Sequence, residues 1–329
     1  MSSADHATEG GKTLLLVAGS GRSGTSLCAG LLHQLGMHIP QPEVAANDTN
    51  PRGFGEPRWS VDFHQQLLRS VGVRPEDARP AAWDITARLD GSAGAGRRLQ
   101  AWLEGELASS SRVLVKDPRI TWFMPLYQGV GARVGVQPRV LTMLRHPAAS
   151  IRSRQLAYGQ GSSDTHRLVG WLNMMLFLEH RTRDLPRALV AYDALLTDWR
   201  SALVEAERGV GTALVTGTRA EQQRDADALV DPSLRRAPDS WSGLDVPDDL
   251  REAAEQAHQA LASDATDELD RLREWYTAYY ATAESVARSS INAARVAERR
   301  KLQREQQDAA PAPGRGRSLV GSFVRRIRA

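Results

Sequence analysis

Glycine, hydroxyl and basic residues follow one another between Gly19 and Ser26 in an order that suits binding of a phosphate or a group resembling it. The segment reads GSGRSGTS. The apolar run at residues 14–18 predicts a buried strand before it, and an apolar-periodic helix is expected to begin near Gly24. At such a junction, backbone N–H groups and the positive end of the helix dipole point at one spot. The sequence therefore predicts an anion cradle, and a tight turn that binds no ligand is the alternative.

The spacing of this loop is close to that of a nucleotide-kinase P-loop, but one residue differs. Gly19 is followed after four residues by Gly24, and Ser26 supplies the hydroxyl. Thr25 stands where that motif has lysine, and the cation lies inside the loop at Arg22. Transfer of the γ-phosphate of a magnesium nucleotide uses the lysine on the β and γ oxygens. Its loss therefore argues against a kinase or an ATPase.

A second group of charged residues follows the apolar run at residues 113–115, which predicts a buried strand. Lys116, Asp117 and Arg119 come at the end of this strand. Because ligands bind at the C-terminal edge of open α/β sheets, these side chains are expected beside the cradle. For Lys116 and Asp117, an ion pair that closes the strand is the alternative.

A third strand is predicted at residues 140–144, and Arg145 follows it directly. A helix is expected beyond Pro147, which places Ser153 on an early turn facing back toward Arg145. An arginine and a hydroxyl presented together suit a second phosphate.

Carboxylates lie in the loop between the first two predicted helices. Residues 39–55 contain prolines and glycines that prevent regular structure, and Glu43, Asp48 and Glu56 occur in or directly after this loop. One of them could act as a general base toward a hydroxyl group. A solvated loop carboxylate or a helix cap is the alternative for each.

The pattern Gly-x-x-Arg-Ser-Gly-Thr-Ser resembles the 5′-phosphosulfate-binding loop of sulfotransferases that use 3′-phosphoadenosine 5′-phosphosulfate (PAPS). In that family, the basic residue at the position of Arg22 stabilises the oxygen that bridges phosphate and sulfate. The resemblance implies that the loop amides and hydroxyls hold the 5′-phosphate, the residues concerned being Gly21, Arg22, Ser23, Gly24, Thr25 and Ser26.

A resemblance to the same family also covers the third strand. Its members bind the 3′-phosphate through Arg-x-Pro followed by a serine eight positions after the arginine, and Arg145 and Ser153 fit this pattern. The segment from Asp231 resembles a bacterial element that closes over the 3′-phosphate, which implies the same role for Arg235 and Arg236. A solvated basic loop is the alternative for that segment.

The resemblance also bears on the general base. Lys-Asp-Pro-Arg resembles an element of bacterial sulfotransferases, whereas the animal branch has Lys-x-His, with the lysine on the leaving oxygen and the histidine as base. Lys116 matches the lysine, and Pro118 takes the place of the histidine. The segment NPRGFGE resembles a bacterial element in which a carboxylate acts as base. This implies Glu56 or, failing it, Glu43, with Asp117 as a further candidate.

The expected function is therefore transfer of a sulfuryl group from PAPS to a hydroxyl or amine of a glycan, lipid or small-molecule acceptor by a bacterial-type sulfotransferase. A P-loop nucleotide or small-molecule kinase is one alternative. A non-catalytic nucleotide-binding adaptor is another. No metal site is expected, because no His/Asp/Glu cluster has metal-ligand spacing.

Composition and length set the expected fold. The chain has 329 residues, 41% of them hydrophobic, with a net charge of +3 and one cysteine, Cys28, expected as a buried core thiol. We predict a P-loop-like, three-layer α/β domain with a central, mainly parallel sheet over residues 12–245. A disordered N-terminus is expected at residues 1–11, a helical extension at 246–308 and a flexible basic tail at 309–329.

The C-terminal extension bears on partners and location. Its second helix carries apolar residues at three-four spacing, which favours packing on its own domain, with oligomerisation as the alternative. In the final segment, Leu319, Phe323 and Ile327 lie along one side among arginines, which is compatible with resting on an anionic membrane surface. A disordered solubilising tail is the alternative. A cytoplasmic location is expected, and peripheral attachment to the inner face of the membrane is the alternative. Nucleic-acid binding is not expected, because the main domain has no basic stripe interleaved with aromatic residues.

Overall fold

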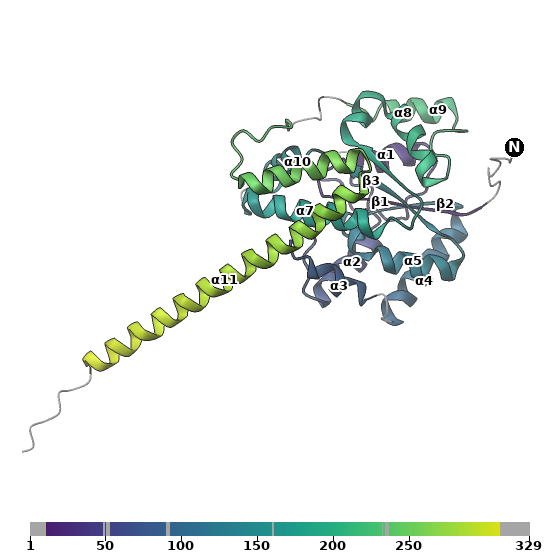
Figure 1. The fold of residues 1–329 in the computed structure, drawn as a ribbon. Helices are drawn as coiled ribbons and strands as arrows, with labels where there is room; N and C mark the ends of the chain where they lie inside the picture. Colours follow the sequence, from purple (N-terminus) through teal and green to yellow (C-terminus); the bar gives the residue numbers. More distant parts are fainter. Residues whose placement is uncertain are drawn as a thin grey trace, which may run out of the picture. The chain divides into compact units, whose positions relative to one another are not determined.

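Four parallel strands form the central sheet, in the order β2-β1-β3-β4. Their bounds are β1 (Thr13–Gly19), β2 (Arg112–Lys116), β3 (Pro138–Leu144) and β4 (Arg187–Ala191). Leu16 of β1 is level with Val115 of β2 and Val140 of β3. Because the strands are parallel and in this register, the carboxyl ends of β1, β2 and β3 meet at one edge of the sheet (Figure 1).

The computed structural model describes residues 11–48, 50, 53–89, 93–159, 161–231, 233 and 237–309. Arg235 and Arg236, as well as residues 310–329, lie outside this set. Contacts divide the chain into two compact units, the first ending at Ala278 and the second beginning at Tyr279. The first unit therefore includes α10 (Asp248–Ala262) and the start of α11 (Thr266–Ala309), which the sequence assigns to the C-terminal extension.

The helices alternate with the strands along the chain. They are α1 (Thr25–Gln34), α2 (Arg58–Ser70), α3 (Ala81–Ala87), α4 (Ala93–Ser109), the short 3₁₀ helix η1 (Pro118–Phe123), α5 (Met124–Val134), α6 (Pro147–Tyr158), α7 (Asp164–Arg181), α8 (Tyr192–Val210), α9 (Ala220–Asp227), α10 (Asp248–Ala262) and α11 (Thr266–Ala309).

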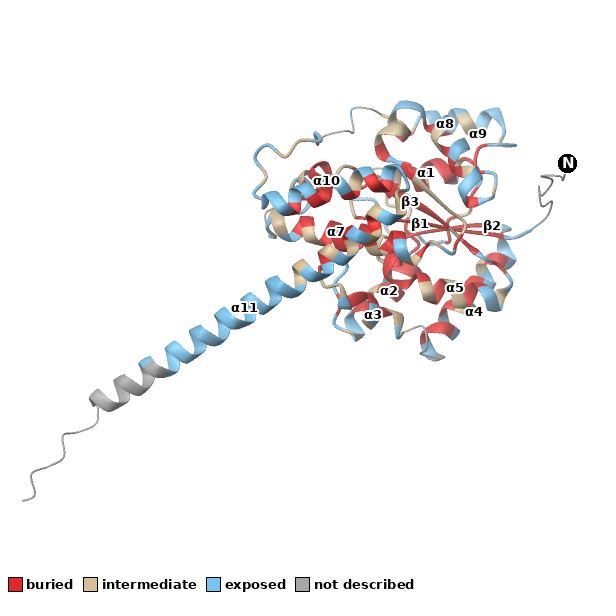
Figure 2. Cartoon of the chain, in the orientation of Figure 1, coloured by how far each residue is buried: buried red, intermediate tan, exposed pale blue. Residues whose placement is uncertain are grey.

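Helices cover both faces of the sheet, and each face has its own hydrophobic core (Figures 1 and 2). Alternate residues of β1 divide between the cores: Leu14 and Leu16 pack toward α2, α4 and α5, whereas Leu15 and Val17 pack toward α1, α8 and α9. Strands buried on both faces are expected to be continuous apolar runs, as β1 is. The prediction of an α/β domain with a parallel sheet between two helical layers is confirmed.

The one cysteine is buried in the core between α1 and the sheet. Burial raises the pKa of the Cys28 thiol to about 12, and the nearby charge of Lys116 only partly opposes this effect. A thiol with so high a pKa is not nucleophilic at neutral pH. The expectation of a packed core thiol is confirmed.

A tyrosine in the first part of α11 is hydrogen-bonded to a loop of the first unit. The Tyr276 hydroxyl is buried, donates to the Ala78 carbonyl at 2.6 Å and lies 2.9 Å from the Val169 carbonyl. Leu269 and Leu272 of the same helix are also buried. This part of the predicted apolar stripe thus packs on the sheet-containing unit.

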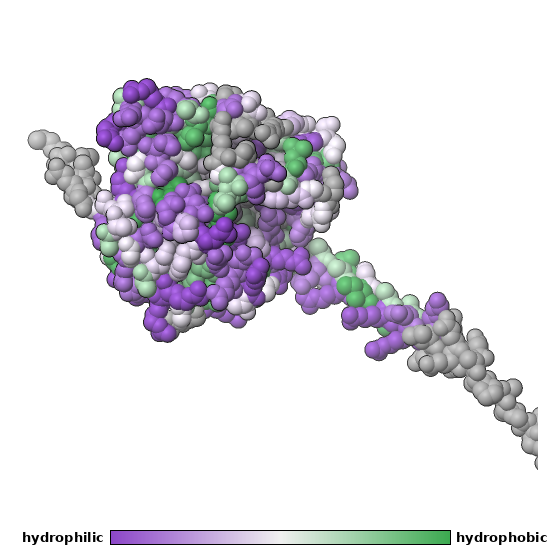
Figure 3. All heavy atoms as spheres, turned by 180° about the vertical axis from the view of Figure 1, so that it is seen from behind, coloured by the Kyte–Doolittle hydropathy of each residue, from purple (hydrophilic) through white to green (hydrophobic). Residues whose placement is uncertain are grey.

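In the second unit, the described residues continue α11. Residues 281–299 are exposed (Figure 2), including Val286, Ile291 and Val296, and Glu284 pairs with Arg288 at 2.7 Å. Seen from behind, the first unit has a largely hydrophilic surface broken by small apolar patches (Figure 3). None of the helices in the described ranges is long and apolar enough to cross a bilayer.

Candidate active site

The loop between β1 and α1 has a backbone that only glycine allows at two positions. Gly19 has φ 135° and Gly24 has φ 94°, and Arg22 between them also has a positive φ, 69°. A Cβ at Gly19 would lie 2.7 Å from the Met143 carbonyl oxygen, and one at Gly24 would overlap the Tyr192 ring. Changes of backbone handedness within a loop turn N–H groups toward one point, which forms an anion-binding concavity. The loop therefore has the changes of backbone handedness that an anion cradle requires.

Arg22, Ser153 and Arg145 come together, although they belong to two distant segments. Arg22 Nε donates to Ser153 Oγ at 3.2 Å, and Arg145 Nη1 donates to the Arg22 carbonyl at 3.0 Å. The Arg145 guanidinium also lies over the Tyr192 ring, 4.5 Å from its centroid. The end of β3 and the start of α6 thus meet the loop after β1, as the sequence predicts for a site with two phosphates.

Arg145 is a buried cation. It is 8% exposed, and burial lowers its pKa, although the charges of Tyr192 and Asp193 act in the opposite direction. Among the residues that the structure describes, it forms no ion pair. A buried guanidinium whose carboxylate neighbours lie beyond ion-pair distance suits an anionic ligand that accepts hydrogen bonds.

Lys116, Glu56 and Ser26 form a second group at the end of β2. Lys116 Nζ lies 2.6 Å from Glu56 Oε1, 3.0 Å from the Phe54 carbonyl and 3.2 Å from Ser26 Oγ. Lys116 is 2% exposed and Glu56 is 7% exposed. Asn50 Nδ2 donates to the same Ser26 hydroxyl at 3.1 Å. The pair therefore lies directly against the first turn of α1.

The other carboxylates have different surroundings. Glu43 is half-buried and accepts a hydrogen bond from Gln41 Nε2 at 2.9 Å. Asp117 is fully buried, where it accepts from His64 Nδ1 at 2.8 Å and from Arg119 Nη1 at 2.6 Å. Of the candidate bases, Glu56 is thus the one that contacts Lys116.

The Asp117–His64 pair closes the start of η1 in the core. Burial raises the pKa of Asp117, but the hydrogen bond and charge of His64, together with Arg119, outweigh it and lower the pKa to about 2. The Tyr127 hydroxyl lies 3.2 Å from His64 Nε2, and burial raises its pKa. These contacts are structural, because both ring nitrogens of the buried His64 have hydrogen-bond partners in the core.

The depressed pKa of Asp117 predicts a pH dependence of stability. The folded-state pKa lies below the unfolded value, so the stabilisation is present above about pH 4 and is lost as the pH falls through about 2. We expect this loss to be about 2 kcal/mol of unfolding free energy and to be absent in Asp117→Asn. Urea unfolding between pH 5 and pH 2 measures it, with Asp84→Asn, an exposed ion-pair partner, as control. Equal pH slopes in the wild type and Asp117→Asn would contradict it.

The residues present fit a nucleotide with separate 3′- and 5′-phosphates. The cradle would hold the 5′-phosphate, and Arg145 with Ser153 would hold the 3′-phosphate. Ser20 Oγ, in the loop itself, is buried and has no hydrogen-bond partner among the described residues. Within the same residues, no group of three or more His, Cys, Asp or Glu side chains could hold a metal ion.

Sequence reasoning missed two residues that shape the loop. Tyr192, at the start of α8, packs against Gly24 and under Arg145. Arg154 is buried on α6, donates from Nε to the Gly21 carbonyl at 3.2 Å and pairs with Glu76. The direct succession of Ser153 and Arg154 was visible in the sequence, but the rotation of α6 that turns both toward the loop was not.

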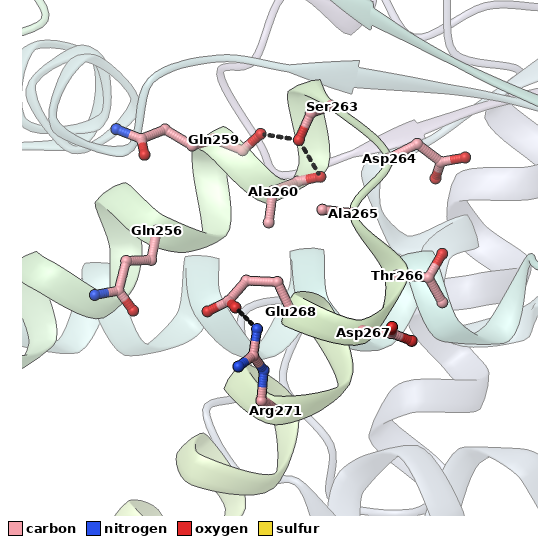
Figure 4. Close-up of a pocket in the computed structure, with 10 residues that line it drawn as sticks. All are labelled: Gln256, Gln259, Ala260, Ser263, Asp264, Ala265, Thr266, Asp267, Glu268 and Arg271. Carbon is pink, nitrogen blue, oxygen red and sulfur yellow. Dashed lines mark hydrogen bonds and ion pairs between the residues drawn. The ribbon is translucent and has the colours of Figure 1, made fainter.

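Two hollows lie away from this site. One, of about 630 Å³, lies at the turn from α10 to α11 and contains the Glu268–Arg271 ion pair (Figure 4). Another, of about 410 Å³, lies beside β4 and is lined by residues of β4, α7, α8 and the end of α10. Neither hollow is lined by any of the candidate site residues. The candidate site is therefore identified by the chemistry and contacts of its side chains.

The chain is similar to two solved sulfotransferase domains. For the sulfotransferase domain of the Synechococcus PCC 7002 olefin synthase, identity is 16%, the TM-score is 0.45, and 78% of this chain and 97% of that domain are covered. For the sulfotransferase domain from the curacin biosynthetic pathway, the values are 16%, 0.41, 78% and 98%. No family model matches the chain. No curated protein matches it either.

Proposed function

We propose that the protein is a sulfotransferase that moves a sulfuryl group from PAPS to the hydroxyl or amine of an acceptor. The observation that carries this proposal is the contact between Arg22 and Ser153, at 3.2 Å, with Arg145 beside them. It brings together two segments, 131 residues apart in sequence, each of which we expect to bind a phosphate. PAPS has two phosphates on one nucleoside, which is what such a site would bind.

PAPS, when bound, supplies the sulfuryl group and a 5′-phosphate leaving oxygen. The loop amides with Thr25 and Ser26 would hold the 5′-phosphate, and Arg22 would neutralise charge on the bridging oxygen. Transfer is expected to be in line with a loose transition state, by analogy with phosphoryl transfer, so positioning and charge stabilisation provide most of the catalysis.

The Lys116–Glu56 pair would couple removal of the acceptor proton to charge stabilisation of the leaving oxygen. Glu56 would take the proton of the acceptor hydroxyl or amine while the acceptor atom bonds to sulfur and the bond from sulfur to the 5′-phosphate oxygen breaks. A protonated Glu56 no longer neutralises Lys116, which lies 2.6 Å away. The lysine charge is then available to the leaving oxygen when negative charge develops on it.

The acceptor belongs to the glycan, lipid or small-molecule class in this proposal. Contact of residues 309–329 with the inner face of the membrane, a homo-oligomer formed through α11 and a cytoplasmic location stay predictions.

Calorimetric titration with adenosine 3′,5′-bisphosphate tests the proposal. Arg145→Ala is expected to lower the affinity about 10- to 100-fold, because a charge-assisted hydrogen bond to a phosphate is lost. Arg139→Ala is the control, since Arg139 lies at the other end of β3 and donates to the Val210 carbonyl. ATP with magnesium should bind weakly.

Other outcomes identify the alternatives. Tight, magnesium-dependent ATP binding that ignores Arg145 would overturn the proposal in favour of a kinase. Tight binding of the bisphosphate without turnover of PAPS, over a panel of hydroxyl and amine acceptors, would favour a nucleotide-binding adaptor.

A further inference from the structure

Two consecutive carbonyl groups of the anion loop are bonded to buried arginines. The Gly21 carbonyl accepts from Arg154 Nε at 3.2 Å, and the Arg22 carbonyl accepts from Arg145 Nη1 at 3.0 Å. In a trans peptide, the C=O and the following N–H point in opposite directions. The bond from Arg154 therefore fixes the N–H of Arg22 on the side away from α6.

Without this bond, the Gly21–Arg22 peptide could turn over. Arg22 has φ 69°, a conformation that costs a residue with a side chain about 1–2 kcal/mol. Turning the peptide would relieve this strain, and Gly21 has no Cβ to oppose the change. The turned peptide would present a carbonyl oxygen to the cradle, where it would repel an anion. The native orientation therefore needs an external partner.

Burial and an ion pair hold Arg154 in the position from which it donates to the Gly21 carbonyl. It is 6% exposed and approaches the loop so closely that a Cβ at Gly21 would lie 2.9 Å from its Nη2. Its ion pair with Glu76 adds a second anchor. Burial is the larger effect and lowers the pKa of Arg154, and the charge of Glu76 opposes it.

Glu76 belongs to a loop that has its own supports. Trp122 Nε1 donates to the Pro75 carbonyl at 2.9 Å, and Asn173 Nδ2 donates to the Asp77 carbonyl at 2.7 Å. Asp77 in turn accepts from Arg79 Nη2 at 2.6 Å. Contacts on both sides of Glu76 thus hold the backbone from which its carboxylate reaches Arg154.

We infer that Arg154, supported by Glu76, is a positioning residue for the 5′-phosphate. It acts through the backbone, by holding the Gly21–Arg22 peptide with its N–H toward the cradle, and it does not contact the nucleotide. The inference rests on the proposed function, because it assigns the cradle to the 5′-phosphate of the bound nucleotide.

The test compares two ligands that differ by one phosphate. Affinities for adenosine 3′,5′-bisphosphate and for adenosine 3′-monophosphate are measured by calorimetry, and their ratio gives the contribution of the 5′-phosphate. Arg154→Met is expected to lower this ratio about 10- to 100-fold while the affinity for the 3′-monophosphate stays unchanged. Arg154→Lys, which keeps a donor, should restore part of the ratio.

Arg167→Met is the matched control. Arg167 is equally buried at 6% exposed and also donates to a backbone carbonyl, that of Gly159, but it does not bond to the loop. Its loss should leave the ratio as in the wild type. Should Arg154→Met not fold, Glu76→Gln lowers the ratio less but in the same direction.

Three results would be adverse. A wild type that binds the bisphosphate, together with an unchanged ratio in Arg154→Met, overturns the inference alone. An equal loss for both ligands does the same, since it indicates general damage to the fold. A wild type that does not bind the bisphosphate at all overturns the proposed function and the inference with it.

Discussion

Glu56→Gln is expected to lower kcat for sulfuryl transfer by about 10²- to 10⁴-fold, the usual contribution of a general base. The amide cannot take a proton, but its oxygen can still accept a hydrogen bond from Lys116, which lies 2.6 Å from the carboxylate. The affinity for adenosine 3′,5′-bisphosphate should therefore change little. Glu56→Ala is less informative, because an unpaired buried lysine costs about 3–5 kcal/mol of stability.

Steady-state rates with PAPS and an acceptor, followed by release of the bisphosphate, measure this effect. Glu43→Gln is the matched control, because it removes the other loop carboxylate, whose neighbour is Gln41 and not Lys116. Its rate should stay close to that of the wild type. A large loss in Glu43→Gln, with little change in Glu56→Gln, would transfer the role of base to Glu43.

Gly24→Ala is expected to abolish binding of the bisphosphate and to lower the free energy of unfolding by about 2–5 kcal/mol. Two effects add. Gly24 has φ 94°, which disfavours any side chain, and its Cβ would overlap the Tyr192 ring. The Tyr192 ring has little room to move away, because the Arg145 guanidinium lies over it at 4.5 Å from the ring centroid.

Gly72→Ala separates these two effects. Gly72 has φ 65°, and a Cβ there would meet nothing within 4 Å. This substitution should cost only the backbone strain, about 1–2 kcal/mol, and should leave nucleotide affinity unchanged. Urea unfolding and calorimetry on both variants provide the comparison. Similar stabilities of the two variants would show that the loop can move away from Tyr192.

The sequence was sufficient to place the main parts of the site. Apolar runs identified β1, β2 and β3, and parallel strands bring their carboxyl ends to one edge, so the meeting of Arg22, Lys116 and Arg145 at that edge could be foreseen. The roles of these residues stay predictions. The order of the residues along the chain was informative because each lies at the end of a strand or within three residues after it.

The choice among the carboxylates could not be made in the same way. Consecutive residues at the end of a strand point to opposite faces. Lys116 accordingly turns toward Glu56, and Asp117 turns toward His64. This alternation was visible for Asp117, but which loop carboxylate would reach Lys116 depended on the path of an irregular loop. Nor did the sequence indicate Arg154, whose partners depend on the rotation of α6 against two loops.

The bond from Tyr276 to Ala78 also affects how the protein is made. Tyr276 follows Ala78 by 198 residues, and chains fold from the N-terminus as they leave the ribosome. The anion loop and the first three strands are therefore synthesised long before the tyrosine that fastens the loop carrying Glu76. A nascent chain that stops before α11 lacks this bond. The loop that carries Glu76 therefore gains this hydrogen bond only when the last part of the first unit has been translated.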